Sequence, residues 1–190
     1  PGKQQIKLEG RTILIYENIK TFIKRLLDTD IQIAPFEIVS LEKSYRTGLR
    51  VSIEGEEREI FIGGKIDRVD RINGTLRILD YKTGDVDSLS FKDIDDLFIK
   101  DNEKHKKEIL QALIYTYVLK ENIDDQYSFQ PAIYSLRKLF DDKFNPLVKR
   151  GRNSFSFEDI ESDFIAELKI LISEIFSASS EYRQTSDERF

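Results

Sequence analysis

The chain has 190 residues, a formal net charge of -5 and no cysteine. Its length suits a single domain, 1–190. The absence of cysteine excludes a disulfide, a zinc–thiolate site or an iron–sulfur cluster in this chain. No apolar run approaches the roughly 18 residues of a membrane-spanning helix. The negative charge argues against a protein that coats nucleic acid indiscriminately, because that affinity comes mainly from the neutralisation of phosphates by lysine and arginine.

The first third of the chain predicts one helix and then a series of short strands. Apolar residues recur at helical spacing from about Ile13 to Leu27, which indicates an amphipathic helix. Glu37 to Tyr45 is extended in character, Gly48 separates it from an alternating run at Leu49 to Glu54, and a further short strand is expected at Glu59 to Ile62. We therefore expect an antiparallel meander that leads into a hairpin.

Asn73 and Gly74 predict the turn of a β-hairpin that runs from about Lys65 to Gly84. Asn-Gly between two runs of β-branched and aliphatic residues is the strongest short hairpin signal, because a type I′ turn needs positive φ at both central positions. Counting outward from this turn sets Asp67 opposite Asp80. Like charges that face each other across two strands are destabilising, so folding gives no reason for this pair, whereas a divalent cation would.

Lys82 stands two residues after Asp80 and is therefore expected on the same face of the strand. Hard cations such as Mg²⁺ prefer carboxylate oxygens, so two aspartates and one main-chain carbonyl would make an open metal site. A lysine beside such a site suits phosphodiester hydrolysis, because it can stabilise charge on the attacked phosphate. The same count sets Lys65 opposite Lys82. The alternative is that Asp67 and Asp80 are ordinary exposed residues at a sheet edge.

The register also separates a second set of charged residues from this face. Asp70 is set opposite Arg77 on the other face of the hairpin, where a cross-strand ion pair is the better interpretation. Arg68 is expected on that same face. We therefore predict a structural role for Arg68 rather than a catalytic one.

The second half of the chain predicts helical segments around one further strand. A short helical piece is expected at Phe91 to Phe98, and a clear amphipathic helix at Asn102 to Leu119. Phe129 to Leu136 is a strand in which Pro131 favours an edge position. A final helix is expected at Glu158 to Phe176.

The segment from Arg137 to Asn153 is long, mixed in composition and basic. Segments of this length without regular structure are often functional or disordered. Its lysines and arginines are compatible with a contact to the DNA backbone, or simply with a solvated surface.

Three motifs in this order resemble the PD-(D/E)XK nuclease superfamily: Gly64-x-x-Asp67-Arg68-Val69-Asp70, Asp80-Tyr81-Lys82-Thr83-Gly84 and Gln111-x-x-x-Tyr115. More narrowly, the chain is similar to the RecB-like nuclease domain of bacterial helicase–nucleases of the RecBCD and AddAB type. The resemblance implies an α+β fold, with a central mixed, mainly antiparallel sheet flanked by helices and the αβββαβ core of restriction endonucleases. The predicted order of elements agrees with it.

The resemblance also assigns the metal and catalytic residues. It implies that Asp67 and Asp80 hold Mg²⁺ or Mn²⁺, that the main-chain carbonyl of Tyr81 adds a ligand, and that Lys82 stabilises the attacked phosphate. Glu42 is a candidate third acid, because similar proteins often carry a glutamate on the strand before the Gly-x-x-Asp motif. The alternative for Glu42 is an exposed surface residue.

Gln111 and Tyr115 are implied to line the active-site groove and position substrate. They lie four residues apart, so they stand one above the other on a helix. Without the resemblance, a half-buried polar pair is an equally good interpretation. RecB-like nucleases also commonly carry a metal-binding histidine upstream of the sheet, whereas no histidine precedes Asp67 here, and the only histidine, His105, is expected at an exposed helix start.

The resemblance implies a metal-dependent deoxyribonuclease of DNA repair or recombination, with exonuclease activity favoured over endonuclease activity and a helicase or other domains as partners. The chain starts at Pro1 and contains no methionine, so we expect a fragment of a larger protein, and its lack of cysteine suits the cytoplasm. Two alternatives stay open. One is a catalytically silent module of nuclease fold that binds DNA or docks proteins, and the other is an unrelated α/β domain whose motifs match by coincidence.

Overall fold

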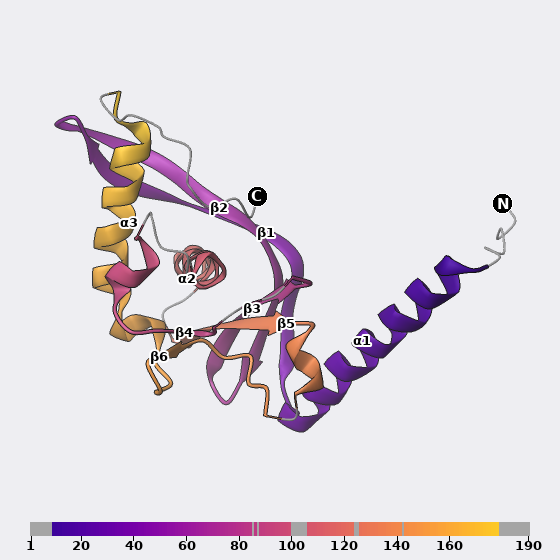
Figure 1. Ribbon diagram of the computed structural model, residues 1–190. Coiled ribbons are helices and arrows are strands. Elements are labelled where there is room, and N and C mark those ends of the chain that lie inside the picture. Colours follow the sequence, from indigo (N-terminus) through magenta and orange to yellow (C-terminus); the bar gives the residue numbers. More distant parts are fainter. Residues whose placement is uncertain are drawn as a thin grey trace, which may run out of the picture.

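The computed structural model describes residues 9–84, 86, 88–99, 106–123, 126–141 and 143–178 (Figure 1). Its helices and strands are α1 (Arg11–Ile33), β1 (Glu37–Ile53), β2 (Glu56–Ile72), β3 (Thr75–Lys82), β4 (Ser90–Phe91), α2 (Lys107–Lys120), β5 (Ser128–Ser135), β6 (Lys149–Arg150) and α3 (Glu161–Phe176). Three short 3₁₀ helices are η1 (Ile94–Leu97), η2 (Lys138–Phe140) and η3 (Phe157–Asp159).

The central sheet has four strands in the order β1-β2-β3-β5. The first three strands are antiparallel neighbours, and β5 runs parallel to β3 after the crossover through α2. This arrangement confirms the predicted mixed, mainly antiparallel sheet and the αβββαβ order. It also confirms the edge position of Pro131, since β5 is the last strand of the sheet.

β1 and β2 are each one continuous strand of 17 residues, so the predicted break at Gly48 is wrong. Gly48 pairs with Phe61 in the part of the ladder that runs without a shift from Lys43–Ile66 to Ile53–Glu56. A Cβ added to Gly48 would lie 2.8 Å from Glu59 Oε1, and one added to Gly63 would overlap the carbonyl oxygen of Tyr45. These glycines mark close packing inside long strands rather than turns.

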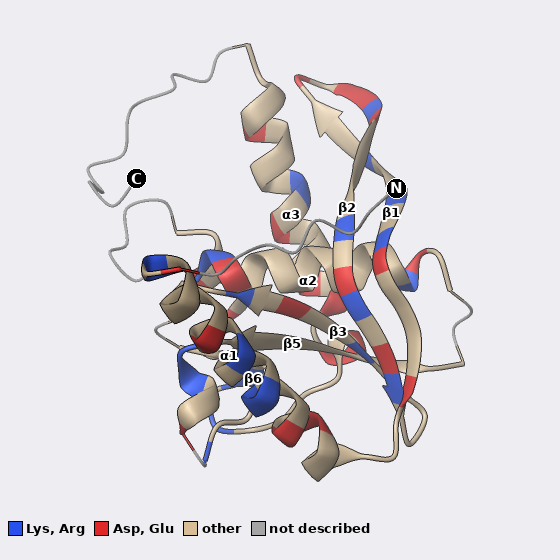
Figure 2. Ribbon diagram, turned by 90° about the vertical axis from the view of Figure 1, so that its right-hand side faces the viewer, with Lys and Arg blue, Asp and Glu red and all other residues tan. Residues whose placement is uncertain are grey.

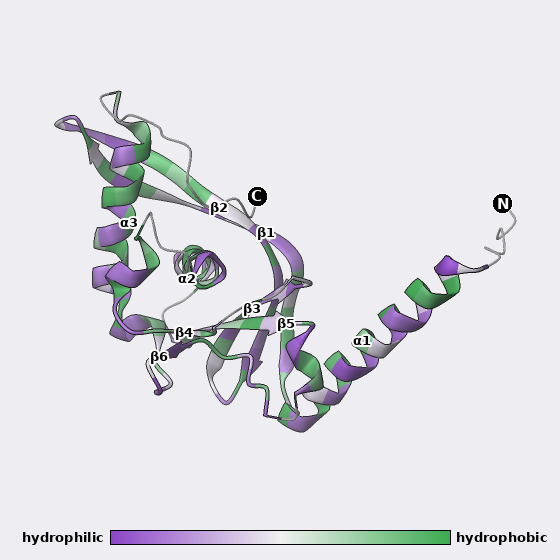
Figure 3. Cartoon of the chain, in the orientation of Figure 1, coloured by the Kyte–Doolittle hydropathy of each residue, from purple (hydrophilic) through white to green (hydrophobic). Residues whose placement is uncertain are grey.

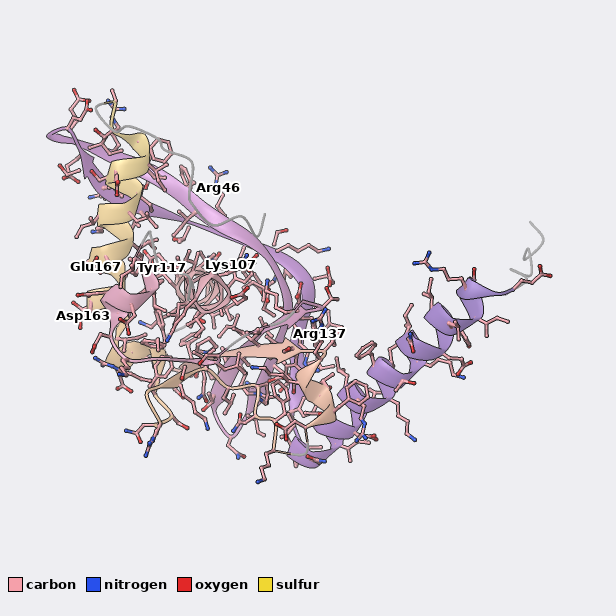
Figure 4. The ribbon with its side chains drawn as sticks, in the orientation of Figure 1. Arg46, Lys107, Tyr117, Arg137, Asp163 and Glu167 are labelled. Atoms are coloured by element: carbon pink, nitrogen blue, oxygen red, sulfur yellow. The ribbon has the colours of Figure 1, made fainter. Side chains whose placement is uncertain are left out.

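The main core lies between one face of the sheet and the helices α2 and α3, which cover it in Figure 1. Figure 4 shows side chains filling the space between α2 and the sheet. The core includes Val51 and Ile66 from the β1–β2 hairpin, Leu113 from α2 and Phe164 from α3, all with at most 1% of their surface exposed. A smaller cluster on the other face contains Leu79, Ala132, Tyr134 and Leu139, with Leu26 of α1 packed against it.

The helix α1 is longer than the predicted Ile13 to Leu27 and lies mostly beside the body rather than on it (Figure 1). Figure 3 shows apolar residues along its length. Ile19 and Ile23 are 51% and 53% exposed. Within the described residues, its contacts with the rest of the chain come from Phe22 onward: the Phe22 ring meets that of Phe140 edge to face, Leu26 packs against the smaller cluster, and Asp30 binds Arg68.

The segment after β5 is joined to the sheet by main-chain hydrogen bonds that its sequence does not predict. The Ile133 amide donates to the Pro146 carbonyl and the Val148 amide to the Pro131 carbonyl, so this segment follows the outer edge of β5. The Lys149 amide then donates to Leu89 as β6 pairs with β4. The segment thus shields the free edge of the sheet, and its contact with DNA stays a prediction.

The helix predicted from Asn102 begins at Lys107 as α2, and His105 lies outside the described residues. The helical piece predicted at Phe91 to Phe98 is a single 3₁₀ turn, η1. None of the described helices is long and apolar enough to cross a membrane. Lysine and arginine alternate with aspartate and glutamate along β1 and β2 (Figure 2), so this hairpin does not present a uniformly basic face.

Candidate active site

The hairpin turn has the predicted geometry and register. Asn73 and Gly74 have φ angles of 48° and 82°, and the ladder confirms the pairs Ile72–Thr75 and Asp70–Arg77. The ladder ends at Arg68–Leu79. The expected pairs Asp67–Asp80 and Lys65–Lys82 therefore lie beyond its hydrogen-bonded part.

Asp67 reaches across to β3 where this ladder ends. Its Oδ2 accepts a hydrogen bond of 2.9 Å from the main-chain amide of Tyr81. The Asp67 carboxylate therefore holds the backbone of the residue between Asp80 and Lys82. This bond keeps the two predicted motifs together although regular strand pairing has stopped.

Asp80 is buried, with 5% of its surface exposed. Its Oδ2 lies 2.9 Å from Lys82 Nζ, close enough for an ion pair, yet among the described residues this oxygen has no well-aligned hydrogen-bond donor. Burial is the largest cause that raises the pKa of the Asp80 carboxyl, the Lys82 ammonium opposes the rise, and the charges of Asp67 and Glu108 add to it. A buried carboxylate of this kind is suited to a bound cation.

Lys82 is held by a chain of contacts that runs through all three motifs. Its Nζ donates to Gln111 Oε1 at 2.6 Å, and Gln111 Nε2 donates to the Tyr115 hydroxyl at 2.9 Å. The Tyr115 ring in turn lies against the backbone of Gly64, where an added Cβ would meet Cε1 at 2.7 Å. The structure thus brings together Asp80, Lys82, Gln111 and Tyr115.

Glu42 lies on β1, where it is exposed and has a φ of 51°. Its carboxylate forms an ion pair with Lys65, which raises the pKa of that ammonium. Lys65 therefore has an acidic partner on β1. Within the described ranges, no three histidine, aspartate or glutamate side chains lie close enough together to hold a metal ion. The role of Glu42 as a third acid stays a prediction.

Two further residues beside the site were not predicted from the sequence. Glu108, in the first turn of α2, lies near enough to Asp80 to raise the pKa of its carboxyl. It precedes Gln111 by three residues, which places both on one side of the helix, and this spacing was the available signal. Ser135 pairs with Lys82 in the parallel ladder and is fully buried.

The opposite face of the hairpin carries the predicted Asp70–Arg77 ion pair. Arg77 Nε donates to Asp70 Oδ1 and its Nη2 to Oδ2, both at 2.7 Å. Arg68 joins this pair, which confirms its structural role, and also binds Asp30 of α1. Asp30 was not predicted, because it is 38 residues away from Arg68 in the sequence.

A family model of the PD-(D/E)XK nuclease superfamily matches residues 15–187 of the chain. The match covers every strand of the four-stranded sheet and both sides of the candidate site. It excludes the alternative of an unrelated domain with coincidental motifs. Comparisons with curated proteins and with solved structures found no match.

Proposed function

Because the chain belongs to the PD-(D/E)XK nuclease superfamily, we propose that it hydrolyses phosphodiester bonds of DNA with the help of Mg²⁺ or Mn²⁺. The observation that carries this proposal is the position of Lys82. Its ammonium lies between the buried carboxylate of Asp80 and the side-chain oxygen of Gln111. A lysine fixed in this way beside two aspartates is suited to bind a phosphate oxygen.

The residues that would hold the cation are Asp67, Asp80 and the main-chain carbonyl of Tyr81. Asp80 is the best-supported ligand, because its carboxylate is buried and its Oδ2, apart from the ion pair with Lys82, has no hydrogen-bond partner among the described residues. When bound, the cation would supply a Lewis acid that lowers the pKa of water and neutralises charge on the phosphate.

Lys82 would donate a hydrogen bond to an oxygen of the attacked phosphate, where negative charge develops. Gln111 holds the lysine through a bond of 2.6 Å, and Tyr115 fixes the amide of Gln111 from its other side. The glutamine and the tyrosine therefore set the direction of the ammonium before substrate binds. This preorganisation is the main contribution of α2 to the site.

We further propose that the domain is an exonuclease rather than an endonuclease and acts in DNA repair or recombination as part of a cytoplasmic helicase–nuclease. The similarity of its three motifs to RecB-like domains supports this proposal. The helicase and other domains of the larger protein would then deliver the DNA end.

The proposal is tested by cleavage of single- and double-stranded DNA with Mn²⁺. Lys82→Ala is expected to lower the cleavage rate by about 10²–10³-fold, as the loss of one preorganised donor typically does. Lys20→Ala, which removes an exposed lysine on α1 with 55% of its side chain accessible, is the matched control. Equal cleavage by the wild-type chain and Lys82→Ala would defeat the assignment.

Calorimetry with Mn²⁺ separates this proposal from a catalytically silent module. A nuclease site is expected to bind Mn²⁺ at millimolar concentration or below, and Asp80→Asn is expected to abolish the binding. No binding by the wild-type chain, together with DNA binding that is insensitive to Asp80→Asn, would identify the silent module instead.

A further inference from the structure

Arg68 is the centre of a buried polar network behind the active-site strands. Only 3% of its surface is exposed. Its Nε and Nη2 donate to Asp70 Oδ2 at 2.9 and 2.6 Å. Its Nη1 and Nη2 donate to the two carboxylate oxygens of Asp30 at 2.6 and 3.1 Å. The guanidinium is thus fixed on two sides by carboxylates.

The network is closed by further buried groups. Arg77 supplies a second guanidinium to Asp70, so two buried cations balance two buried anions. The Tyr134 hydroxyl donates to Asp30 Oδ1 at 3.1 Å, and the Phe36 ring lies 4.8 Å from the Arg68 guanidinium carbon. Groups that are buried and paired in this way have few alternative positions.

One contact leads from this network to the active site. Arg68 Nη1 donates a hydrogen bond of 3.2 Å to the hydroxyl of Tyr81. Tyr81 stands between Asp80 and Lys82 in the sequence, and alternation along β3 directs its side chain to the opposite face of the sheet from theirs. Its main-chain amide binds Asp67 at 2.9 Å. The hydroxyl of Tyr81 is therefore held by Arg68 on one face of the sheet, and its main-chain amide is held by the side chain of Asp67.

We propose that the Arg68–Asp30 pair positions the segment from Asp80 to Lys82 through the Tyr81 hydroxyl. Tyr81 is then a positioning residue as well as a main-chain metal ligand. The helix α1, which supplies Asp30, becomes part of the support of the site although none of its residues lies in it. The part of the test that measures metal binding rests on the proposed function, because it needs a chain that binds Mn²⁺.

The test compares two tyrosine substitutions in the same network. Tyr81→Phe removes the hydroxyl that Arg68 holds, and Tyr134→Phe removes the hydroxyl that binds Asp30. Both keep the ring contact between these residues, whose centroids lie 5.5 Å apart. Because Tyr134 lies on β5 and not between the site residues, it is the matched control.

Two quantities are measured on the full chain. The first is the dissociation constant for Mn²⁺ from calorimetry. We expect it to rise about 10-fold in Tyr81→Phe, as for other residues that orient metal ligands, and to rise by much less in Tyr134→Phe, which acts on the network only through Asp30. The second is the hydrogen-exchange rate of the residue 81 amide in the absence of metal. We expect this rate to be about 10-fold higher in Tyr81→Phe than in Tyr134→Phe, because loss of the bond from Arg68 makes local opening of this segment easier.

Equal effects of the two substitutions on both quantities would overturn the inference, since the network would then be merely structural. Absence of Mn²⁺ binding by the wild-type chain would instead defeat the proposed function. In that case the exchange rate of the residue 81 amide still decides whether Tyr81 transmits the constraint from Arg68.

Discussion

Tyr115 packs directly against the backbone of Gly64, so closely that an added Cβ would lie 2.7 Å from its Cε1. Gly64→Ala is therefore expected to push the ring away and to break the bond between Gln111 and the Tyr115 hydroxyl. Misplacement of a catalytic group by about 1 Å can cost roughly 10²-fold in rate. We expect a loss of this order in DNA cleavage with Mn²⁺, measured beside the wild-type chain.

Gly48→Ala is the control for this prediction. Its Cβ would meet the end of the Glu59 side chain at 2.8 Å, and that side chain can turn away. Gly48→Ala is thus expected to cleave DNA at the wild-type rate. A wild-type rate for Gly64→Ala would show that Tyr115 does not need this close approach.

The motifs and the order of elements were readable from the sequence because each rests on local chemistry. The Asn73-Gly74 turn fixes its own φ angles, and strand alternation then fixes the Asp70–Arg77 pair. Helical spacing of Gln111 and Tyr115 likewise predicts their contact, which the structure shows at 2.9 Å. Such features need no information from distant parts of the chain.

The errors come from contacts between distant segments. Gly48 suggests a strand break, but it pairs with Phe61 and the ladder continues on both sides of it. Asp30 looked like one more polar residue on α1, and only the fold brings it to Arg68. The predicted register that sets Asp67 opposite Asp80 holds as far as the adjacent pair Arg68–Leu79, and strand alternation does not predict that Asp67 also accepts a hydrogen bond from the amide of Tyr81.

Stability without metal is expected to depend on the charge of Asp80. Burial raises the pKa of this carboxyl above its ordinary 3.8, even with the opposing effect of Lys82. The folded state therefore binds the proton more tightly than the unfolded state does, so stability falls as pH rises from 3.8 through the folded pKa. Asp80→Asn is expected to raise the Tm at pH 7, with a gain that vanishes at acidic pH.

The control for this prediction is Asp163→Asn on α3, an exposed position labelled in Figure 4. Its effect on the Tm is expected to be small at every pH. The measurement is thermal unfolding by circular dichroism in a chelating buffer across the pH range. A gain for Asp80→Asn that does not change with pH would contradict the assignment.

Asp70 is expected to act in stability and not in metal binding. It is fully buried and accepts bonds from both Arg68 and Arg77. Asp70→Ala would leave two guanidiniums buried with too few partners, which typically costs about 3–5 kcal/mol. Urea unfolding measures this loss. The exposed Glu37–Arg71 pair is the control, and Glu37→Ala is expected to cost far less than Asp70→Ala, because solvent screens an exposed ion pair.

Most of the apolar surface of α1 is expected to contribute nothing to stability. Ile23 is 53% exposed, so Ile23→Ala should change the free energy of unfolding by no more than about 0.5 kcal/mol. Leu26 packs against the cluster that contains Leu79 and Leu139. Since it is only partly buried, Leu26→Ala should cost roughly 1–2 kcal/mol, below the range for fully buried leucines. Urea unfolding distinguishes the two, and equal losses would mean that α1 packs along its whole length.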